Sequence, residues 1–268
     1  MNLIYDYNYV FKNNNDDNND DNESIIFVHG YNSSPRTFEI FEKYWTRSNY
    51  YALQFPGSNL VKAVKDHKVS VEGFAKLLID FIEQNQIKNV VAIGHSMGGG
   101  VISIAYKMRP DLFKKLIFIT PMNKPQRALY ERYKIDYFPK TFDEYITNTL
   151  SSLYYDPSIL TSNEEWMKKA KQEFDPYVYN NEVIVELGQP KDRTFELIEQ
   201  GLDAIKIPSL LILGEKDGVI LRDECLDYFK QHVKNVEMHW MKKTGHMVFQ
   251  ENFNEFIKII ENFLNKTN

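Results

Sequence analysis

Residues 90–101 read VVAIGHSMGGGV, a short apolar run that leads into a glycine-rich turn. The apolar run is typical of a strand buried on both faces of a parallel sheet, and the residues after the turn have the pattern of a helix. A serine on such a sharp turn needs very small residues two positions away on each side, because larger side chains would collide. Gly94 and Gly98 stand at those positions around Ser96. The G-x-S-x-G spacing therefore predicts that Ser96 is a nucleophile, placed at the carboxyl end of a strand and at a helix N-terminus.

Further apolar runs of strand length lie on both sides of this one. They occupy residues 24–28, 51–55, 116–120, 209–213 and 236–241, and an alternating segment at 3–11 also has a strand pattern. Helical patterns separate several of them, over 70–84 with Ser70 as the N-cap, over 101–108 and over 253–264. Strands that alternate with helices predict an α/β fold with a doubly wound sheet and right-handed crossovers.

Residues 123–206 interrupt this alternation. They contain many aromatic residues mixed with charges and no clear buried strand, and about eighty residues is too long for a plain connection in a compact domain. We therefore expect a mostly helical cap at 123–206 that lies over the sheet edge as a lid. Residues 1–122 and 207–268 would then form the α/β core.

A polar run at residues 13–23 alternates acids and amides, as calcium-binding loops do. The comparison fails, because a loop that starts at Asp16 would have Asp21 where glycine is needed and Phe27 where a bidentate glutamate is needed. The prediction for this segment is a flexible, solvated hairpin loop. No other cluster has metal-ligand spacing, so we expect no metal.

A serine hydroxyl is a weak nucleophile and needs a base within hydrogen-bond reach. Among six histidines, His246 is the candidate base, because it lies in a loop directly after the last predicted strand and before the last helix. His29 and His95 flank the site in sequence but lie inside turns, where packing and loop hydrogen bonds explain them. Three further histidines are expected in surface or core roles on two helices and a strand: His67, His232 and His239.

The base needs an acid that orients it. Asp217 follows the buried run 210–213, so its carboxylate should emerge at the same sheet edge as Ser96. Glu215 is the rival, but it lies so close to the strand end that it should point elsewhere. The order Ser96, Asp217, His246 along the chain is nucleophile, acid, base.

Acyl transfer also needs two hydrogen-bond donors for the oxyanion that develops on the substrate. The backbone N–H of Met97 is the first candidate, since it follows the nucleophile at the helix start. The second is the backbone N–H of Tyr31, in the loop after the strand at 24–28. Gly30 allows that loop to approach the substrate closely.

With these pieces in place, the chain resembles the α/β-hydrolase superfamily, in particular its branch of esterases, lipases and proline-iminopeptidase-like enzymes. The matching segments are IIFVHGYNSS (25–34), AIGHSMGGG (92–100), LLILGEKDGV (210–219) and KKTGHMVFQENFNEFIKIIENFL (242–264). The resemblance implies a mainly parallel sheet of about eight strands, a helical cap inserted after strand six, and a Ser-His-Asp mechanism without a cofactor. Two features depart from it: one clear strand precedes His29, and residues 56–58 read PGS without the aspartate that many relatives have just before this loop.

The reaction that these residues favour is hydrolysis of a small-molecule carboxylic ester through an acyl-enzyme on Ser96. Thioester, N-terminal proline peptide and carbon–carbon bond hydrolysis use the same triad and remain alternatives. The iminopeptidase alternative is weakened because Met97, not tryptophan, follows the serine. Epoxide and haloalkane hydrolases of this superfamily need an aspartate nucleophile at position 96. This chain has serine there, which excludes their chemistry. A ligand-binding protein without activity is also an alternative, but such receptors commonly lose the serine or histidine, and all three triad positions are filled here.

Composition limits which other classes of protein and which compartments fit the chain. The chain has 268 residues, of which 43% are apolar, and its net charge of −5 without a basic stripe excludes nucleic acid as the expected partner. A single cysteine precludes an intrachain disulfide and fits a reducing compartment. The first residues carry Asp6 and no basic run, unlike a signal peptide, and no stretch approaches the ~18 consecutive apolar residues of a membrane span. A cytoplasmic protein is the prediction.

Overall fold

A computed structural model describes residues 3–14 and 23–266 of the chain. Within them, seven strands form one sheet in the order β1-β3-β2-β4-β5-β6-β7. All neighbours pair in parallel except β1 with β3. The strands are β1 (Tyr9–Lys12), β2 (Ser24–Val28), β3 (Tyr50–Leu53), β4 (Val90–His95), β5 (Phe113–Ile119), β6 (Ser209–Gly214) and β7 (Val236–Met241). The predicted mainly parallel α/β-hydrolase sheet is therefore confirmed.

The N-terminal edge of the sheet is shorter than the resemblance implied. One strand, β1, precedes β2 in the described residues, so the sheet has seven strands there instead of about eight, and the long insertion follows its fifth strand. The alternating segment at 3–11 pairs only from Tyr9 onward. Before it, Tyr5 packs its ring edge-on against Phe81 and donates its hydroxyl to the carbonyl of Gln54. The described residues before Tyr9 form no strand, and Tyr5 is held against Phe81 by this packing. Most of the polar run predicted at 13–23, residues 15–22, lies outside the described residues.

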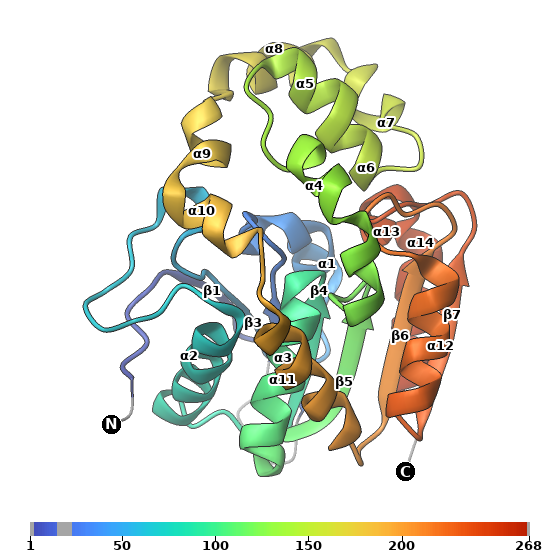
Figure 1. Cartoon of the computed structure of the whole chain (residues 1–268). Helices are drawn as coiled ribbons and strands as arrows, with labels where there is room; N and C mark the ends of the chain where they lie inside the picture. Colours follow the sequence, from blue (N-terminus) through green and yellow to red (C-terminus); the bar gives the residue numbers. More distant parts are fainter. Residues whose placement is uncertain (1–2, 15–22, 267–268) are drawn as a thin grey trace.

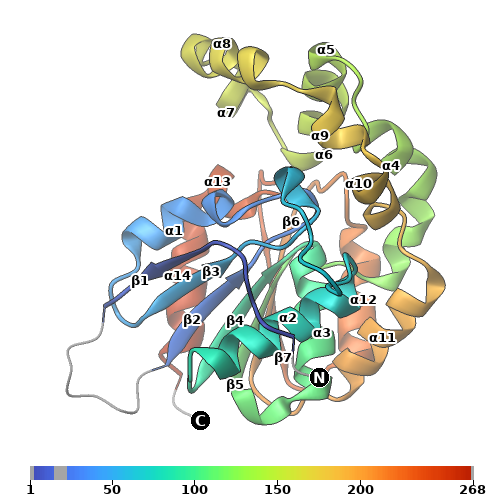
Figure 2. The same cartoon turned by 90° about the vertical axis from the view of Figure 1, so that its left-hand side faces the viewer.

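Helices cover both faces of the sheet (Figures 1 and 2). On one face lie α2 (Val71–Gln84), α3 (Met97–Met108), α11 (Asp192–Asp203) and α12 (Arg222–His232), and on the other α1 (Glu39–Tyr44) and α14 (Phe253–Leu264). Alternate residues of each strand pack against the helices on opposite faces of the sheet, since successive side chains of a strand point to opposite faces. In β2, Ile26 and Val28 belong to the first core, and Ile25 and Phe27 to the second. All four are fully buried, as the unbroken apolar runs predict.

The helix starts follow from local sequence. Ser70 caps α2, and its Oγ accepts the N–H of Gly73 at 3.0 Å. The helix after the serine begins at Met97, four residues before the predicted start, because the glycines at 98–100 lie within its first turn. It ends at Met108, before Pro110, as the sequence indicates.

Between β5 and β6 the described chain is helical and contains no strand. The helices from α4 to α10, here called the cap helices, lie beyond the carboxyl ends of the strands (Figures 1 and 2). They are α4 (Tyr130–Asp136), α5 (Phe142–Glu144), the π-helix η5 (Tyr145–Leu150), α6 (Ser151–Leu153), α7 (Ser158–Thr161), α8 (Glu164–Glu173), α9 (Pro176–Asn180) and α10 (Glu182–Leu187). The next helix, α11, returns to the core, where Gly201 lies against the backbone of Ser103.

Short elements complete the chain: the 3-10 turns η1 (Pro35–Phe38), η2 (Ser58–Leu60), η3 (Pro110–Leu112) and η4 (Lys124–Leu129), and α13 (Val248–Glu251). Within residues 3–14 and 23–266, no helix combines the length and the apolar character needed to cross a membrane.

Candidate active site

Ser96 occupies the turn between β4 and α3 with a strained backbone, at φ 53° and ψ −121°. A Cβ on Gly94 would lie 2.6 Å from the carbonyl oxygen of Gly98, and a Cβ on Gly98 would lie 2.0 Å from that of Val28. Both positions therefore require glycine. The Ser96 N–H donates to Ile119, and the Ser96 carbonyl accepts the N–H of Met122. These bonds to the end of β5 hold the serine in a conformation that few residues adopt.

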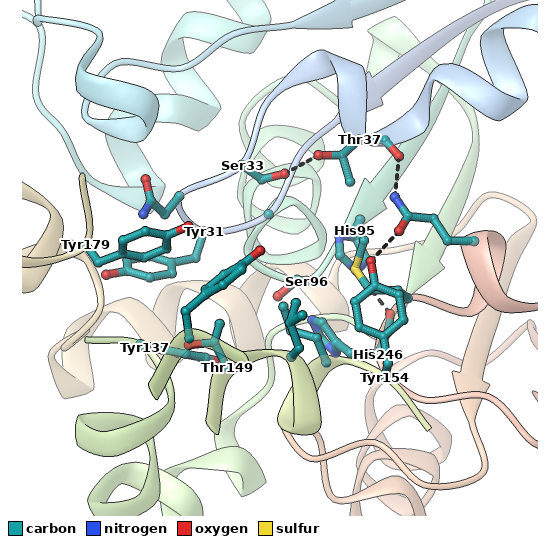
Figure 3. Close-up of a pocket in the computed structure, with 17 residues that line it drawn as sticks. Tyr31, Ser33, Thr37, His95, Ser96, Tyr137, Thr149, Tyr154, Tyr179 and His246 are labelled. Atoms are coloured by element: carbon teal, nitrogen blue, oxygen red, sulfur yellow. Dashed lines mark hydrogen bonds between the residues drawn. The ribbon is translucent and has the colours of Figure 1, made fainter. Parts of the chain in front are cut away.

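His246 and Asp217 form a buried pair, with 2.8 Å between Nδ1 and Oδ2 and side chains that are 2% and 1% exposed. The other Asp217 oxygen accepts the N–H groups of Val219 (2.7 Å) and Ile220 (2.9 Å). An ionised carboxylate only accepts hydrogen bonds, so Nδ1 of His246 is the donor, and in the neutral ring Nε2 carries the lone pair. His246 and Ser96 line the same cavity, and Figure 3 shows the ring beside the serine.

The rival acid points elsewhere. Oε2 of Glu215 accepts the backbone N–H of Lys243 at 2.8 Å, and the side chain is exposed. The structure thus brings Asp217, and not Glu215, to His246.

The two histidines next to the site in sequence support its loops. Nε2 of His29 accepts the N–H of Phe55 at 3.0 Å, so its Nδ1 donates to the carbonyl of Gly30 at 2.8 Å. Burial lowers the pKa of His29 to about 4, which keeps the ring neutral. Nε2 of His95 donates to the carbonyl of His246 at 3.2 Å, and its buried Nδ1 has no partner among the described residues. Burial also holds the pKa of His95 well below its usual value.

His95 was expected to pack and to make loop hydrogen bonds, but its partner in the His246 loop was not predicted. No local pattern could have revealed it, because the two residues are 151 positions apart. The remaining histidines lie elsewhere. His67 was expected on a helix but lies in the connection before α2, where its Nδ1 bonds the hydroxyl of Tyr7.

The candidate oxyanion donors lie beside Ser96. Gly30 approaches the serine so closely that a Cβ on it would be 3.0 Å from the Ser96 Cβ. Tyr31 follows, with its hydroxyl bonded to the carbonyl of Ile184 in the cap helices at 2.8 Å. Met97 is the first residue of α3, where N–H groups have no acceptor within the helix.

Two cavities in the described part of the chain reach Ser96. The larger cavity, about 260 Å³, also contains His246 and extends to Thr37, Gln250 and Tyr179. The smaller cavity, about 30 Å³, also contains Met97 and extends to Met122 and Leu187. Among the described residues that line either one, there is no Asp, Glu, Lys or Arg. Burial raises the pKa of the Tyr31 and Tyr137 hydroxyls that border both, so these groups are neutral.

Residues 152–156, here called the anchor segment, connect the cap helices to the loops of Asp217 and of His246. The carbonyl of Ser152 accepts the N–H of Gly218, and that of Leu153 accepts the N–H of His246 at 2.8 Å. Glu251 bridges from the other side, since it accepts the N–H of Gly245 with one oxygen and that of Tyr155 with the other.

The described residues contain no group of three or more histidine, cysteine, aspartate or glutamate side chains placed to hold a metal ion. Cys225 is buried in α12, and burial raises the pKa of its thiol.

Comparison with known proteins places this chain in a family. The family model described as "Serine aminopeptidase, S33" matches residues 19–252. The chain belongs to this family of α/β hydrolases. A Mycoplasma pneumoniae protein named "Putative esterase/lipase 1" is 25% identical over 247 residues, which cover 91% of each chain. A number of solved structures share the fold.

Two solved structures illustrate the shared fold. A mutant of the meta-cleavage product hydrolase CumD has a TM-score of 0.80 at 15% identity over 97% of this chain and 95% of its own. The 2-hydroxy-6-oxo-6-phenylhexa-2,4-dienoate hydrolase BphD of Rhodococcus sp. strain RHA1 has a TM-score of 0.73 at 16% identity, with 91% of each chain covered. Family and relatives together identify the chain as a hydrolase.

Proposed function

We propose that this chain is a serine esterase that forms an acyl-enzyme on Ser96, with His246 as base and Asp217 as orienting acid. The observation that carries the proposal is the buried 2.8 Å contact between His246 Nδ1 and Asp217 Oδ2. It leaves Nε2 of His246 free to accept a proton in the cavity that Ser96 lines.

In the proposed mechanism, His246 takes the proton of Ser96 while Oγ attacks the ester carbonyl. The N–H groups of Met97 and Tyr31 stabilise the oxyanion of the tetrahedral intermediate. His246 then gives its proton to the leaving alcohol oxygen, and water repeats the sequence to release the acid. Asp217 fixes the tautomer of His246 and stabilises the imidazolium.

The lining of the cavities favours a neutral ester over the two charged alternatives. An aminopeptidase must hold the ammonium group of its substrate, and a dienoate hydrolase must hold a carboxylate. Leaving such a charge unpaired in a desolvated site costs several kcal/mol. The described lining offers neither an acidic nor a basic side chain for that purpose. Met97, in place of a tryptophan after the serine, weighs further against an iminopeptidase.

The test compares p-nitrophenyl acetate and butyrate with a thioester and with proline p-nitroanilide. We expect hydrolysis of the oxygen esters above the other two, and a loss of at least about 10³-fold in kcat for Ser96→Ala. A fluorophosphonate probe should label the wild-type protein and not this variant. Ester hydrolysis that persists in Ser96→Ala, or preferred cleavage of the anilide, contradicts the proposal.

A matched pair of variants tests the acid. Asp217→Asn should lower kcat by about 10⁴-fold, because the amide favours the wrong tautomer of His246. Glu215→Gln makes the same chemical change two residues away and should keep kcat within about twofold, since its side chain is exposed and bonds Lys243 instead of His246. The reverse outcome would assign the role to Glu215.

A further inference from the structure

The two cavities at Ser96 are separated by a stack of aromatic rings. Tyr31 and Tyr137 line both cavities, and their rings stack at 5.2 Å with an interplanar angle of 26°. Tyr133 stacks on the other face of Tyr137 at 4.7 Å and 11°. The hydrogen bond from Tyr31 to Ile184 fixes one end of the stack to the cap helices. The partition is therefore built from packed rings with little freedom to turn.

The two cavities also differ in which part of the catalytic machinery they contain. His246 lines the larger cavity and, in the described lining, is absent from the smaller one, whereas Met97 belongs to the smaller. Figure 3 shows Ser96, His246 and Tyr154 together around the larger cavity. The leaving alcohol must lie next to the group that protonates it. In the tetrahedral intermediate the acyl substituent then points away from His246, toward the smaller cavity.

We propose that the smaller cavity holds the acyl group and the larger one the alcohol, which makes the substrates esters of short acyl chains with larger, neutral alcohols. This inference rests on the proposed esterase function. A space of about 30 Å³ is two to three times what one water requires on the same measure. It fits an acetyl to butyryl group.

The walls of the smaller cavity that face the core oppose its enlargement. Val71, Met122 and Leu187 are all buried and belong to the main hydrophobic core. Moving them to admit a longer chain would disturb close packing, which is costly in protein interiors.

The larger cavity has the character of an alcohol site. The hydroxyls of Ser33 and Thr37 bond each other at 2.6 Å, and Gln250 donates to the Thr37 carbonyl and accepts from the hydroxyl of Tyr154. These uncharged donors and acceptors stand beside the rings of Tyr145 and Tyr179, whose centroids are 5.6 Å apart. Apolar faces with a few fixed polar groups are typical of sites for neutral small molecules.

The experiment measures kcat/KM for p-nitrophenyl esters from acetate to octanoate in the wild type and in two matched variants. The wild type should prefer acetate to butyrate over octanoate by at least about 100-fold, because each methylene that does not fit is worth about tenfold or more. Leu187→Ala, in the smaller cavity, should raise the ratio of hexanoate to acetate by about tenfold or more. Leu150→Ala removes the same atoms from the larger cavity and should change that ratio by less than about twofold.

Met122→Ala, also in the smaller cavity, gives a second reading in case Leu187→Ala does not fold. A shift of chain-length preference in Leu150→Ala, but in neither Leu187→Ala nor Met122→Ala, would reverse the assignment. A wild-type preference for octanoate would overturn it. Failure of the esterase function itself looks different, since esters of every chain length would then be left intact, or would be hydrolysed equally by Ser96→Ala.

Discussion

Replacing Glu251 by glutamine should loosen the connection between the anchor segment and the loop that carries His246. One carboxylate oxygen accepts the N–H of Gly245 at 2.6 Å and the other accepts that of Tyr155 at 2.8 Å. Glutamine has one accepting oxygen, so one of these bonds is lost and an amide donor faces a backbone donor. A hydrogen bond to a charged group is worth about 1.5–3 kcal/mol, which we reduce to about 1–2 kcal/mol because Glu251 is half-exposed.

For a chain of this size that loss should lower Tm by about 2–8 °C. Since Gly245 adjoins His246, kcat should also fall, by about tenfold, as small misplacements of a catalytic group do. Thermal unfolding and p-nitrophenyl acetate hydrolysis measure the two effects. Glu215→Gln is the matched control, because Glu215 also accepts a backbone N–H of this loop, that of Lys243, but is exposed. Equal Tm and kcat in the two variants would refute the anchoring role.

Three further predictions concern the strained turn and its surroundings. Ser96→Gly should be more stable than Ser96→Ala by about 1 kcal/mol in urea unfolding, because glycine adopts φ 53° without strain; equal stability would show that the turn stores no strain. Gly98→Ala places a Cβ 2.0 Å from the Val28 carbonyl and should cost about 3 kcal/mol in the same assay, so an unchanged midpoint would contradict the close approach. Burial lowers the pKa of His29 to about 4, so the folded protein binds fewer protons than the unfolded chain between about pH 6.5 and 4. Lowering the pH through that window should therefore remove about 3 kcal/mol of stability from the wild type. The His29→Gln variant should lose clearly less stability over the same pH range.

The fold could be predicted where the sequence signal is local and continuous. Buried parallel strands need apolar residues on both faces, so each of the runs around Phe27, Ile93 and Leu211 identified its strand without knowledge of its neighbours. The segment at 3–11 was harder, because its alternation suits a strand and also suits a chain that packs aromatic rings on a helix. In the structure Tyr5 packs its ring against Phe81 of α2, a partner 76 residues away that no local pattern indicates.

The same distinction applies to the candidate site. The triad candidates lie in loops directly after strands, and parallel strands bring such loops to one edge, so topology alone placed Ser96, Asp217 and His246 together. The roles of His95 and Glu251 depend on single hydrogen bonds to backbone atoms far away in the sequence or in the cap helices. The partition of the site depends on how Tyr137 stacks against Tyr31. Such contacts have no period and no motif, and only the folded chain specifies them.

The hydrogen bonds of the anchor segment bear on how substrate enters. Ser152 and Leu153 accept N–H groups from the loops of Asp217 and of His246, and Tyr155 shares Glu251 with the His246 loop. Moving this segment would break those bonds and displace both partners of the buried pair at once. A substrate must therefore enter without displacing this segment. The other part of the cap helices, α7 to α10, meets the core near the site through hydrogen bonds from the Tyr31 hydroxyl to Ile184 and from Asn32 to Val178. Because Tyr31 also supplies a candidate oxyanion N–H, its bond to Ile184 ties the position of that donor to α10.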